Sequence, residues 1–186
     1  MAFLVCRCRP FIISRPSRPR QYFTFCGGSG KTGGPDEGNN TVTWRTADDT
    51  DIQFIAKDGE TLRTAALRRG IVSPHNGNAK LINCRGLGTC GTCAVEIDCK
   101  DGAIDPPERN GIENARLAFP PHGTPGQSSK LRLACQVQVL GDIVVIKRTG
   151  FWGQDINSVA VASEAKTYFG DLEFLLDRKS PKNEEK

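Results

Sequence analysis

The sequence has no long apolar run, no secretory signal and no basic stripe with interleaved aromatic residues. No stretch approaches the roughly 18 apolar residues of a membrane-spanning helix, so we expect no transmembrane segment. Without a secretory signal, structural disulfides are disfavoured. Without a basic stripe, we do not expect nucleic acid as a partner.

Acidic residues are missing from the start of the chain. Residues 1–35 contain no Asp or Glu, whereas arginine recurs there among serine and small residues. Such starts are typical of organelle transit peptides, although a disordered basic tail has the same composition. We predict that residues 1–40 are a transit peptide and linker, whose removal takes away Cys6, Cys8 and Cys26. The predicted destination is the chloroplast (stroma or thylakoid-associated), with the mitochondrion as the alternative.

The same segment accounts for the net charge of +4. Residues 1–40 hold six Lys/Arg and two Asp/Glu, whereas residues 41–186 hold 19 of each sign. A chain of 186 residues is expected to form one domain of ordinary size with tails. We place that domain at residues 41–150 and a C-terminal extension at residues 151–186.

Four cysteines of the predicted domain have a distinctive spacing. Cys84, Cys90 and Cys93 form a C-x5-C-x2-C run, and Cys135 follows forty-two residues after Cys93. Three thiolates on a short loop and a fourth from a distant strand are how a protein holds a [2Fe–2S] cluster. The glycines let the loop bend so that its N–H groups point at the sulfurs. We therefore predict a [2Fe–2S] cofactor with these four ligands.

Other interpretations of the cysteine loop fit less well. Structural zinc sites usually need two C-x2-C pairs, and the domain has one. The glycines also spell G-x-G-x-x-G, but a dinucleotide site would open a helix there, and the residues after Cys93 read as a strand. His75 and His122 are not spaced as Rieske ligands and are expected at the surface. Cys99 is expected to be a free thiol.

The motif resembles the [2Fe–2S] ferredoxins, with one residue more than the plant-type C-x4-C-x2-C loop. It is similar to the adrenodoxin-type loop and to the ferredoxin-like subunit B3 of the photosynthetic NAD(P)H dehydrogenase-like complex of thylakoids. The residues that carry the likeness are the loop, Cys-Ala-Val-Glu-Ile from Cys93, and Arg-Leu-Ala-Cys-Gln around Cys135. The resemblance implies an α+β, β-grasp ferredoxin-like fold and one-electron transfer. No acid–base pair, nucleophile–base pair or substrate motif accompanies the cysteines, so we expect no enzymatic activity.

Hydrophobic periodicity predicts the opening elements. Residues 41–46 and 51–57 alternate as two strands of a hairpin. A helix is predicted at residues 60–69, with Asp58 as its N-cap and Gly70 as its left-handed end. Its buried stripe is expected to consist of the apolar residues Leu62, Ala65 and Ala66.

The second half is predicted from the same signals. Residues 131–139 alternate as a strand that carries Cys135 inward and turns through Gly141-Asp142 into a hairpin partner at residues 143–147. A short helix is predicted from Asn110, with Glu113 at its third position. Its buried residues are expected to be Ile112, Ala115 and Phe119.

The C-terminal extension has a weaker pattern. Phe151 and Trp152 are expected to pack as a lid. Residues 171–177 are expected to form an amphipathic turn, and residues 179–186 to be disordered. The apolar side of that turn would consist of Leu172, Leu175 and Leu176.

The charge of the domain bears on its partner. Residues 41–150 hold 14 Lys/Arg and 12 Asp/Glu, so the strongly acidic surface with which soluble photosynthetic ferredoxins attract partners is missing. Gly88, Thr89, Gly91 and Thr92 are the expected N–H donors to sulfur, and Arg85 adds a positive charge. The predicted partner is a redox protein or a membrane complex. The protein is then a plastid electron carrier or an accessory subunit of a thylakoid electron-transfer complex.

Overall fold

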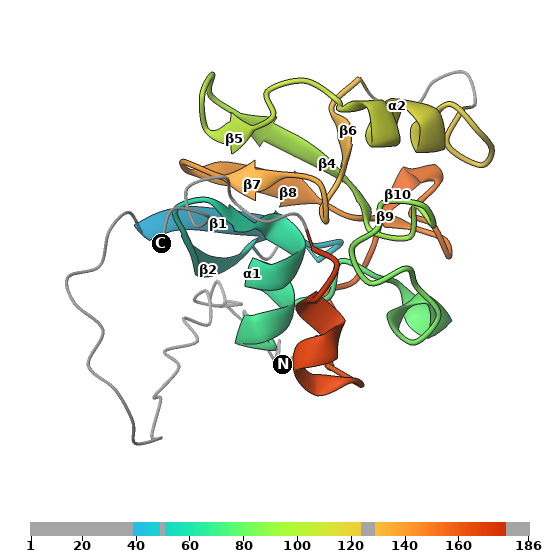
Figure 1. The fold of residues 1–186 in the computed structure, drawn as a ribbon, viewed down its shortest axis with the longest axis horizontal. Coiled ribbons are helices and arrows are strands. Elements are labelled where there is room, and N and C mark those ends of the chain that lie inside the picture. The colour runs from blue at the N-terminus through green and yellow to red at the C-terminus, as the bar shows by residue number, and fades with distance from the viewer. Residues whose placement is uncertain (1–38, 49–50, 124–128, 178–186) are drawn as a thin grey trace, which may run out of the picture. The chain divides into compact units, whose positions relative to one another are not determined.

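The computed structural model describes residues 39–48, 51–123 and 129–177 (Figure 1). Nearly all of the predicted transit segment, and the predicted disordered tail, lie outside these residues. Within them, no helix is long and apolar enough to cross a membrane.

The main sheet has five strands in the order β2-β1-β8-β4-β6. Its strands are β1 (Asn39–Arg45), β2 (Asp51–Lys57), β4 (Ala94–Cys99), β6 (Leu131–Leu133) and β8 (Ile143–Ile146). The predicted hairpin of β1 and β2 is confirmed, with Val42 opposite Phe54. β8 lies between β1, to which it is parallel, and β4, to which it is antiparallel. The sheet is therefore mixed, and its central strand is the last of the five in sequence.

Two small sheets and four short helices complete the described chain. β3 (Glu60–Thr61), β7 (Gln138–Val139) and β5 (Ile104–Asp105) form one sheet, and β9 (Arg148–Thr149) pairs with β10 (Asp155–Val159). The helices are α1 (Leu62–Arg69), α2 (Gly111–Leu117), and the 3-10 helices η1 (Gly77–Lys80) and η2 (Gly170–Phe174). A mixed sheet with few helices is the α+β arrangement that the sequence predicts.

The core lies between the main sheet and α1, and it contains the predicted apolar faces. Val42, Trp44, Leu62, Ala65 and Ala66 are at most 1% exposed. Alternate residues of β1 and one stripe of α1 supply these side chains, as their periods of two and 3.6 residues require. Burial of this apolar surface holds the helix on the sheet.

The start of α1 differs from the prediction and its end does not. The N-cap is Thr61, whose hydroxyl accepts a hydrogen bond from the Thr64 N–H at 3.3 Å, and not Asp58. The helix begins later than predicted because the two residues before it pair with β7 as β3. Gly70 ends the helix with a φ of 69°, the left-handed conformation that glycine adopts without strain.

The predicted hairpin of residues 131–139 with residues 143–147 is wrong. β6 pairs with β4, and β7 pairs with β3 and β5, so residues 131–139 belong to two sheets. The chain turns between them, where the Gln136 N–H donates to Leu133 O at 2.8 Å. This turn brings Cys135 toward the cysteine loop, and a continuous strand would not.

The helix α2 begins where predicted but buries other residues. Asn110 and Glu113 form a capping box, in which each side chain accepts from the other's backbone N–H. Ile112, Ala115 and Phe119 are exposed, so their predicted burial is wrong. The buried residues of α2 are Glu113 and Leu117. Hydrogen bonding determines which face of α2 is buried. The Glu113 carboxylate accepts from Arg132 Nε and Nη2 and from Leu133 N, so this side chain points inward.

The segment at residues 171–177 turns the apolar side of the predicted amphipathic turn toward solvent. Leu172, Leu175 and Leu176 are 65%, 62% and 46% exposed. Glu173 and Asp177, spaced by one helical turn, are buried instead.

The reason for this reversal is Arg63 of α1, which is fully buried. Its Nη2 pairs with Glu173 Oε1, and its Nη1 pairs with Asp177 Oδ1 at 2.9 Å and donates to Glu173 O at 2.9 Å. A buried guanidinium needs anionic partners, because an unpaired charge is very unfavourable in a protein interior. Thus η2 turns its carboxylates inward and its leucines outward.

Arg63→Met is therefore expected to lower the free energy of unfolding by about 3–5 kcal/mol, because it leaves two buried carboxylates without their cation. Arg68→Met is the matched control. Arg68 is exposed on the same helix and lies 4.8 Å above the Phe174 ring, a contact worth about 0.5–1 kcal/mol at the surface. Urea unfolding of the cluster-loaded proteins measures both values. Equal, small losses would show that the buried ion pairs do not stabilise the fold.

Candidate [2Fe–2S] site

The structure brings the four predicted cysteines together as two pairs of thiols. Cys84 Sγ lies 3.2 Å from Cys90 Sγ, and Cys93 Sγ lies 3.5 Å from Cys135 Sγ. The first pair is partly exposed and the second is fully buried. Cys84, Cys90 and Cys93 lie in the loop before β4, and Cys135 lies in the turn after β6.

Two thiol pairs suit a two-iron cluster. A tetrahedral zinc site would gather its ligands around one point. Among the described residues, no three or more His, Cys, Asp or Glu side chains are placed to hold a single ion. Two pairs supply two thiolates to each of two irons, so the donor set and its arrangement fit a [2Fe–2S] cluster. Such a cluster, when bound, accepts and donates one electron.

Two glycines of the cysteine loop are needed for close contacts as well as for conformation. Gly88 has a φ of 80°, and a Cβ there would lie 2.6 Å from Ile112 Cγ2. Gly91 has a φ of 75°, and a Cβ there would lie 2.8 Å from Arg116 Nε. Any larger residue would therefore displace the side chain of Ile112 or Arg116 from the loop, in addition to the strain of its positive φ.

Hydrogen-bond donors surround the sulfurs. Between the free thiols, the Cys90 S–H, together with the backbone N–H groups of Cys90 and Thr89 and the Thr89 hydroxyl, lowers the pKa of Cys84 to about 4. The Cys135 S–H lowers the pKa of Cys93 in the same way. The Thr92 hydroxyl and N–H act on Cys90. Thr89 and Thr92 are thus confirmed as donors, and Cys90 N–H is a donor that the sequence did not suggest.

A directed chain of hydrogen bonds ends at one of these thiols. Arg63 Nε donates to His75 Nε2 at 3.4 Å, because an arginine can only donate. His75 therefore carries its proton on Nδ1, which lies 3.0 Å from Thr92 Oγ1. The Thr92 hydroxyl proton then points to Cys90 Sγ at 3.1 Å. Burial, followed by the charges of Arg63 and Lys147, lowers the pKa of His75 well below its usual value and keeps it neutral.

The prediction that both histidines lie at the surface is wrong. His75 is 2% exposed and His122 is 1% exposed. His122 Nε2 donates to Gly91 O at 3.2 Å, and burial lowers its pKa to about 4. Both imidazoles hydrogen-bond to the cysteine loop, His75 at Thr92 and His122 at Gly91. A single sequence gives no sign of this, because histidines without a ligand motif have no pattern that separates buried from exposed.

Gln136 and Arg85 also hold the loop. Gln136 Nε2 donates to Gly86 O at 2.9 Å and lies 3.5 Å from Cys135 Sγ. The Arg85 guanidinium lies 3.8 Å above the Phe169 ring, and its Nε lies 3.9 Å from Glu173 Oε2. The charge of Arg85 is therefore partly offset by a carboxylate.

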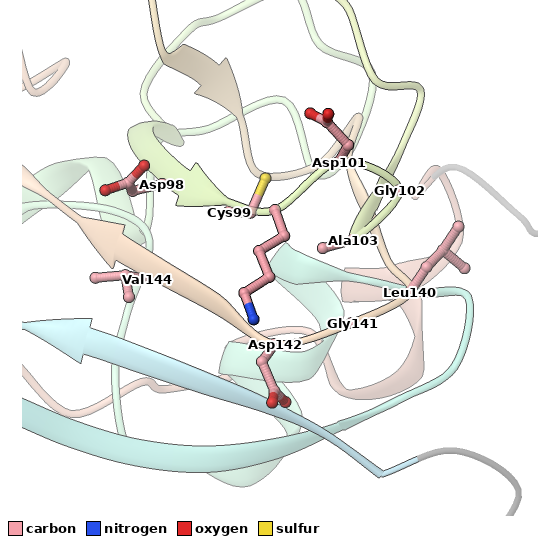
Figure 2. Close-up of a pocket in the computed structure, with 10 residues that line it drawn as sticks. Asp98, Cys99, Asp101, Gly102, Ala103, Leu140, Gly141, Asp142 and Val144 are labelled. Atoms are coloured by element: carbon pink, nitrogen blue, oxygen red, sulfur yellow. The ribbon is translucent and has the colours of Figure 1, made fainter.

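Cys99 lies apart from the four paired thiols. It is exposed at the end of β4 opposite to Cys93, in a surface cavity of about 590 Å³. Figure 2 shows its sulfur with Asp98, Asp101 and Asp142 placed around the same hollow. Burial and the Asp98 carboxylate raise the pKa of this thiol. Cys99 is thus a free thiol, as predicted.

Comparison with known proteins identifies the family. The family model of the 2Fe-2S iron-sulfur cluster binding domain matches residues 45–140, just over half of the chain, including all four paired cysteines. The chain therefore belongs to this family. Its cofactor is a [2Fe–2S] cluster, its fold is ferredoxin-like, and its general role is electron transfer between redox partners.

Solved structures give weaker likenesses. The chain is similar to a ferredoxin from Rhodopseudomonas palustris HaA2, with 25% identity, a TM-score of 0.42, and coverage of 56% of this chain and 92% of that one. It is also similar to the Amycolatopsis cytochrome P450 reductase GcoB, with 24% identity and a TM-score of 0.39. This match covers 66% of the present chain and 28% of the reductase. The comparison with curated proteins found no match.

The ligand assignment predicts opposite results at two cysteines. Cys135→Ser should abolish stable cluster binding, because one iron loses a thiolate. Cys99→Ser, the matched control, should retain about two iron and two sulfide per chain, the content of one [2Fe–2S] cluster. Iron and acid-labile sulfide analysis, with the spectrum of the one-electron-reduced protein, measures both. Full cluster content in Cys135→Ser, or its loss in Cys99→Ser, would contradict the assignment.

Proposed function

We propose that this protein passes single electrons to one dedicated redox partner in the plastid, and that it carries electrons without catalysing a reaction of its own. The four thiols hold the cluster, and the loop donors and buried residues behind it stabilise the thiolates. What distinguishes this protein from a general acidic ferredoxin is the surface beside the loop.

The observation that carries this proposal is an apolar rim at the cysteine loop, formed by Leu87, Ile112, Phe169 and Leu176. These side chains are 50%, 48%, 43% and 46% exposed. Leu87 lies in the loop, Ile112 contacts Gly88, and the chain after Leu176 packs on Gly86. Phe169 lies under the Arg85 guanidinium. Exposed apolar side chains gathered at one place are typical of a protein-binding surface.

The charges beside the apolar rim are mixed and not strongly acidic. Arg85 and Arg116 border the loop, Glu173 and Asp177 are buried in ion pairs with Arg63, and Asp171 of η2 is exposed close to Phe169 in sequence. Such a surface attracts a basic partner weakly. It suits a partner with an apolar contact surface and carboxylates opposite the two arginines.

A second function is an accessory subunit of a thylakoid electron-transfer complex, where the cluster is a relay or structural. The apolar rim favours this alternative as well, because permanent interfaces are more hydrophobic than transient ones. The resemblance of the loop and of the Cys135 segment to subunit B3 also supports it. A subunit would stay bound to its complex through purification, whereas a carrier would dissociate.

The docking proposal predicts slow reduction by ferredoxin–NADP reductase, with a shallow dependence on salt. Pairs steered by opposite charges lose rate steeply as the Debye length falls to about 8 Å at physiological ionic strength. Stopped-flow reduction over a salt series measures this. Fast and steeply salt-sensitive reduction would show that the protein acts as a general carrier.

Variants of the apolar rim provide the control. In intact plastids, Leu87→Ser should reduce recovery of the dedicated partner with the tagged protein, and Ile156→Ser should not. Ile156 is 39% exposed on β10, outside the apolar rim. Both variants should keep their cluster, so a loss in the first alone reports on docking. Equal recovery in both would contradict a docking role for the apolar rim.

The proposed plastid location predicts that a fluorescent protein fused to residues 1–45 enters chloroplasts. The acid-free, arginine-bearing start is the reason. A fusion in which Arg15, Arg18 and Arg20 are replaced by Glu is the control and should stay in the cytosol. Import into mitochondria alone would reassign the compartment and leave the proposed electron transfer unchanged.

A further inference from the structure

Lys147 is a buried cation behind the cysteine loop, at the point where the chain leaves β8. It is 2% exposed. Its Nζ donates to Thr92 O and to Ala94 O, both at 2.8 Å. These two carbonyls flank Cys93, so the ammonium group is bound to the backbone on both sides of one ligand cysteine.

Lys147 has no carboxylate partner in the described part of the chain. Its side-chain contacts there are to the backbone oxygens, and none of the ion pairs between described residues includes it. Arg63 and Arg132, the other cations buried near the site, each pair with buried carboxylates. Lys147 therefore differs from them in lacking an acidic side chain.

The loop after β9 shields this ammonium from water. Gly153 has a φ of 73°, and a Cβ there would lie 2.9 Å from Lys147 Nζ and 3.2 Å from Ala94 O. The rings of Phe151 and Trp152 beside it are half-buried and meet edge to face at 4.7 Å. A side chain at Gly153 would displace the lysine, so the close cover depends on glycine.

An unpaired buried ammonium is unfavourable unless negative charge lies nearby. Burial lowers the pKa of Lys147 to about 8, while the Cys93 and Cys90 thiolates raise it. The charges that act favourably on it are thus those of the paired cysteines. Since the other partners of Lys147 within residues 39–48, 51–123 and 129–177 are carbonyls, these thiolates are the compensating groups there.

We propose that Lys147 is the internal counter-ion of the cluster site, a positioning residue that raises the reduction potential by offsetting the negative charge of the four thiolates. Reduction adds one electron and no bond is formed or broken, so the site becomes more negative by one charge. A fixed cation in a water-excluded position stabilises that added charge more than the oxidised state. The carbonyls of Thr92 and Ala94 hold the ammonium in place.

The test is the midpoint potential of cluster-loaded Lys147→Met and Lys147→Gln, measured by redox titration followed by electron paramagnetic resonance. Both variants should shift to a lower potential, because both remove the charge. Gln keeps an N–H donor for the carbonyls and Met does not. A normal potential in Lys147→Gln would show that hydrogen bonding, and not charge, is what matters, and would overturn the proposal.

Lys57→Met is the matched control, because Lys57 is an exposed cation at the end of β2. Its potential should stay unchanged. Raising the salt from about 0.1 M to about 1 M shortens the Debye length from about 10 Å to about 3 Å, which screens exposed charges and leaves a buried one effective. The shift caused by Lys147→Met should therefore persist in high salt. A shift that disappears there would contradict a buried counter-ion.

Cluster content provides the second measurement if the neutral variants do not retain iron. In that case Lys147→Arg, which keeps the positive charge, should retain about two iron per chain, as a [2Fe–2S] cluster requires. Loss of iron from Lys147→Arg as well would show that shape alone is required at this position and would overturn the proposal.

Discussion

The pairing of β6 with β4 is the constraint on which the cluster site depends. Leu133 lies opposite Ala94 in this register, and Ala134 N donates to Cys93 O at 3.1 Å. Cys135 follows directly and meets Cys93 in the turn. A slip of one residue would reverse the faces of β6 and carry Cys135 away from its partner. Arg132, held by the buried Glu113 of α2, fixes this register, so the helix after the loop is structural.

Negative charge at the site is offset by hydrogen-bond donors and by one buried ammonium group. Backbone N–H groups and threonine hydroxyls contact the sulfurs. The ammonium group of Lys147 is held by two backbone carbonyls. The neutral imidazole of His75 accepts a hydrogen bond from Arg63. The carboxylates of Glu173 and Asp177 lie beside the loop, at Arg85 and Gly86, and are paired with Arg63. Without Arg63, they would add uncompensated negative charge next to the cysteine loop.

Local patterns in the sequence predicted the local features of the fold. The cysteine spacing predicted the grouping of Cys84, Cys90, Cys93 and Cys135, and periodicity predicted the hairpin of β1 and β2 and the buried stripe of α1. Partners far apart in sequence decided the rest. A buried arginine reversed the face of residues 171–177, and a turn at the fourth thiol replaced a hairpin. Amphipathic patterns reveal apolar burial, but they give no sign of a buried ion pair that joins α1 to η2.

The C-terminal segment is coupled to the cluster site through polar contacts. Asp177 and Glu173 hold Arg63, which donates to His75 and thereby fixes the direction in which Thr92 donates to Cys90. The same segment leaves its leucines and Phe169 at the surface beside the loop. A partner that contacts these side chains therefore touches the segment that orients a donor to a thiolate. The proposed docking would therefore act, through η2, on the hydrogen bond that Thr92 donates to Cys90.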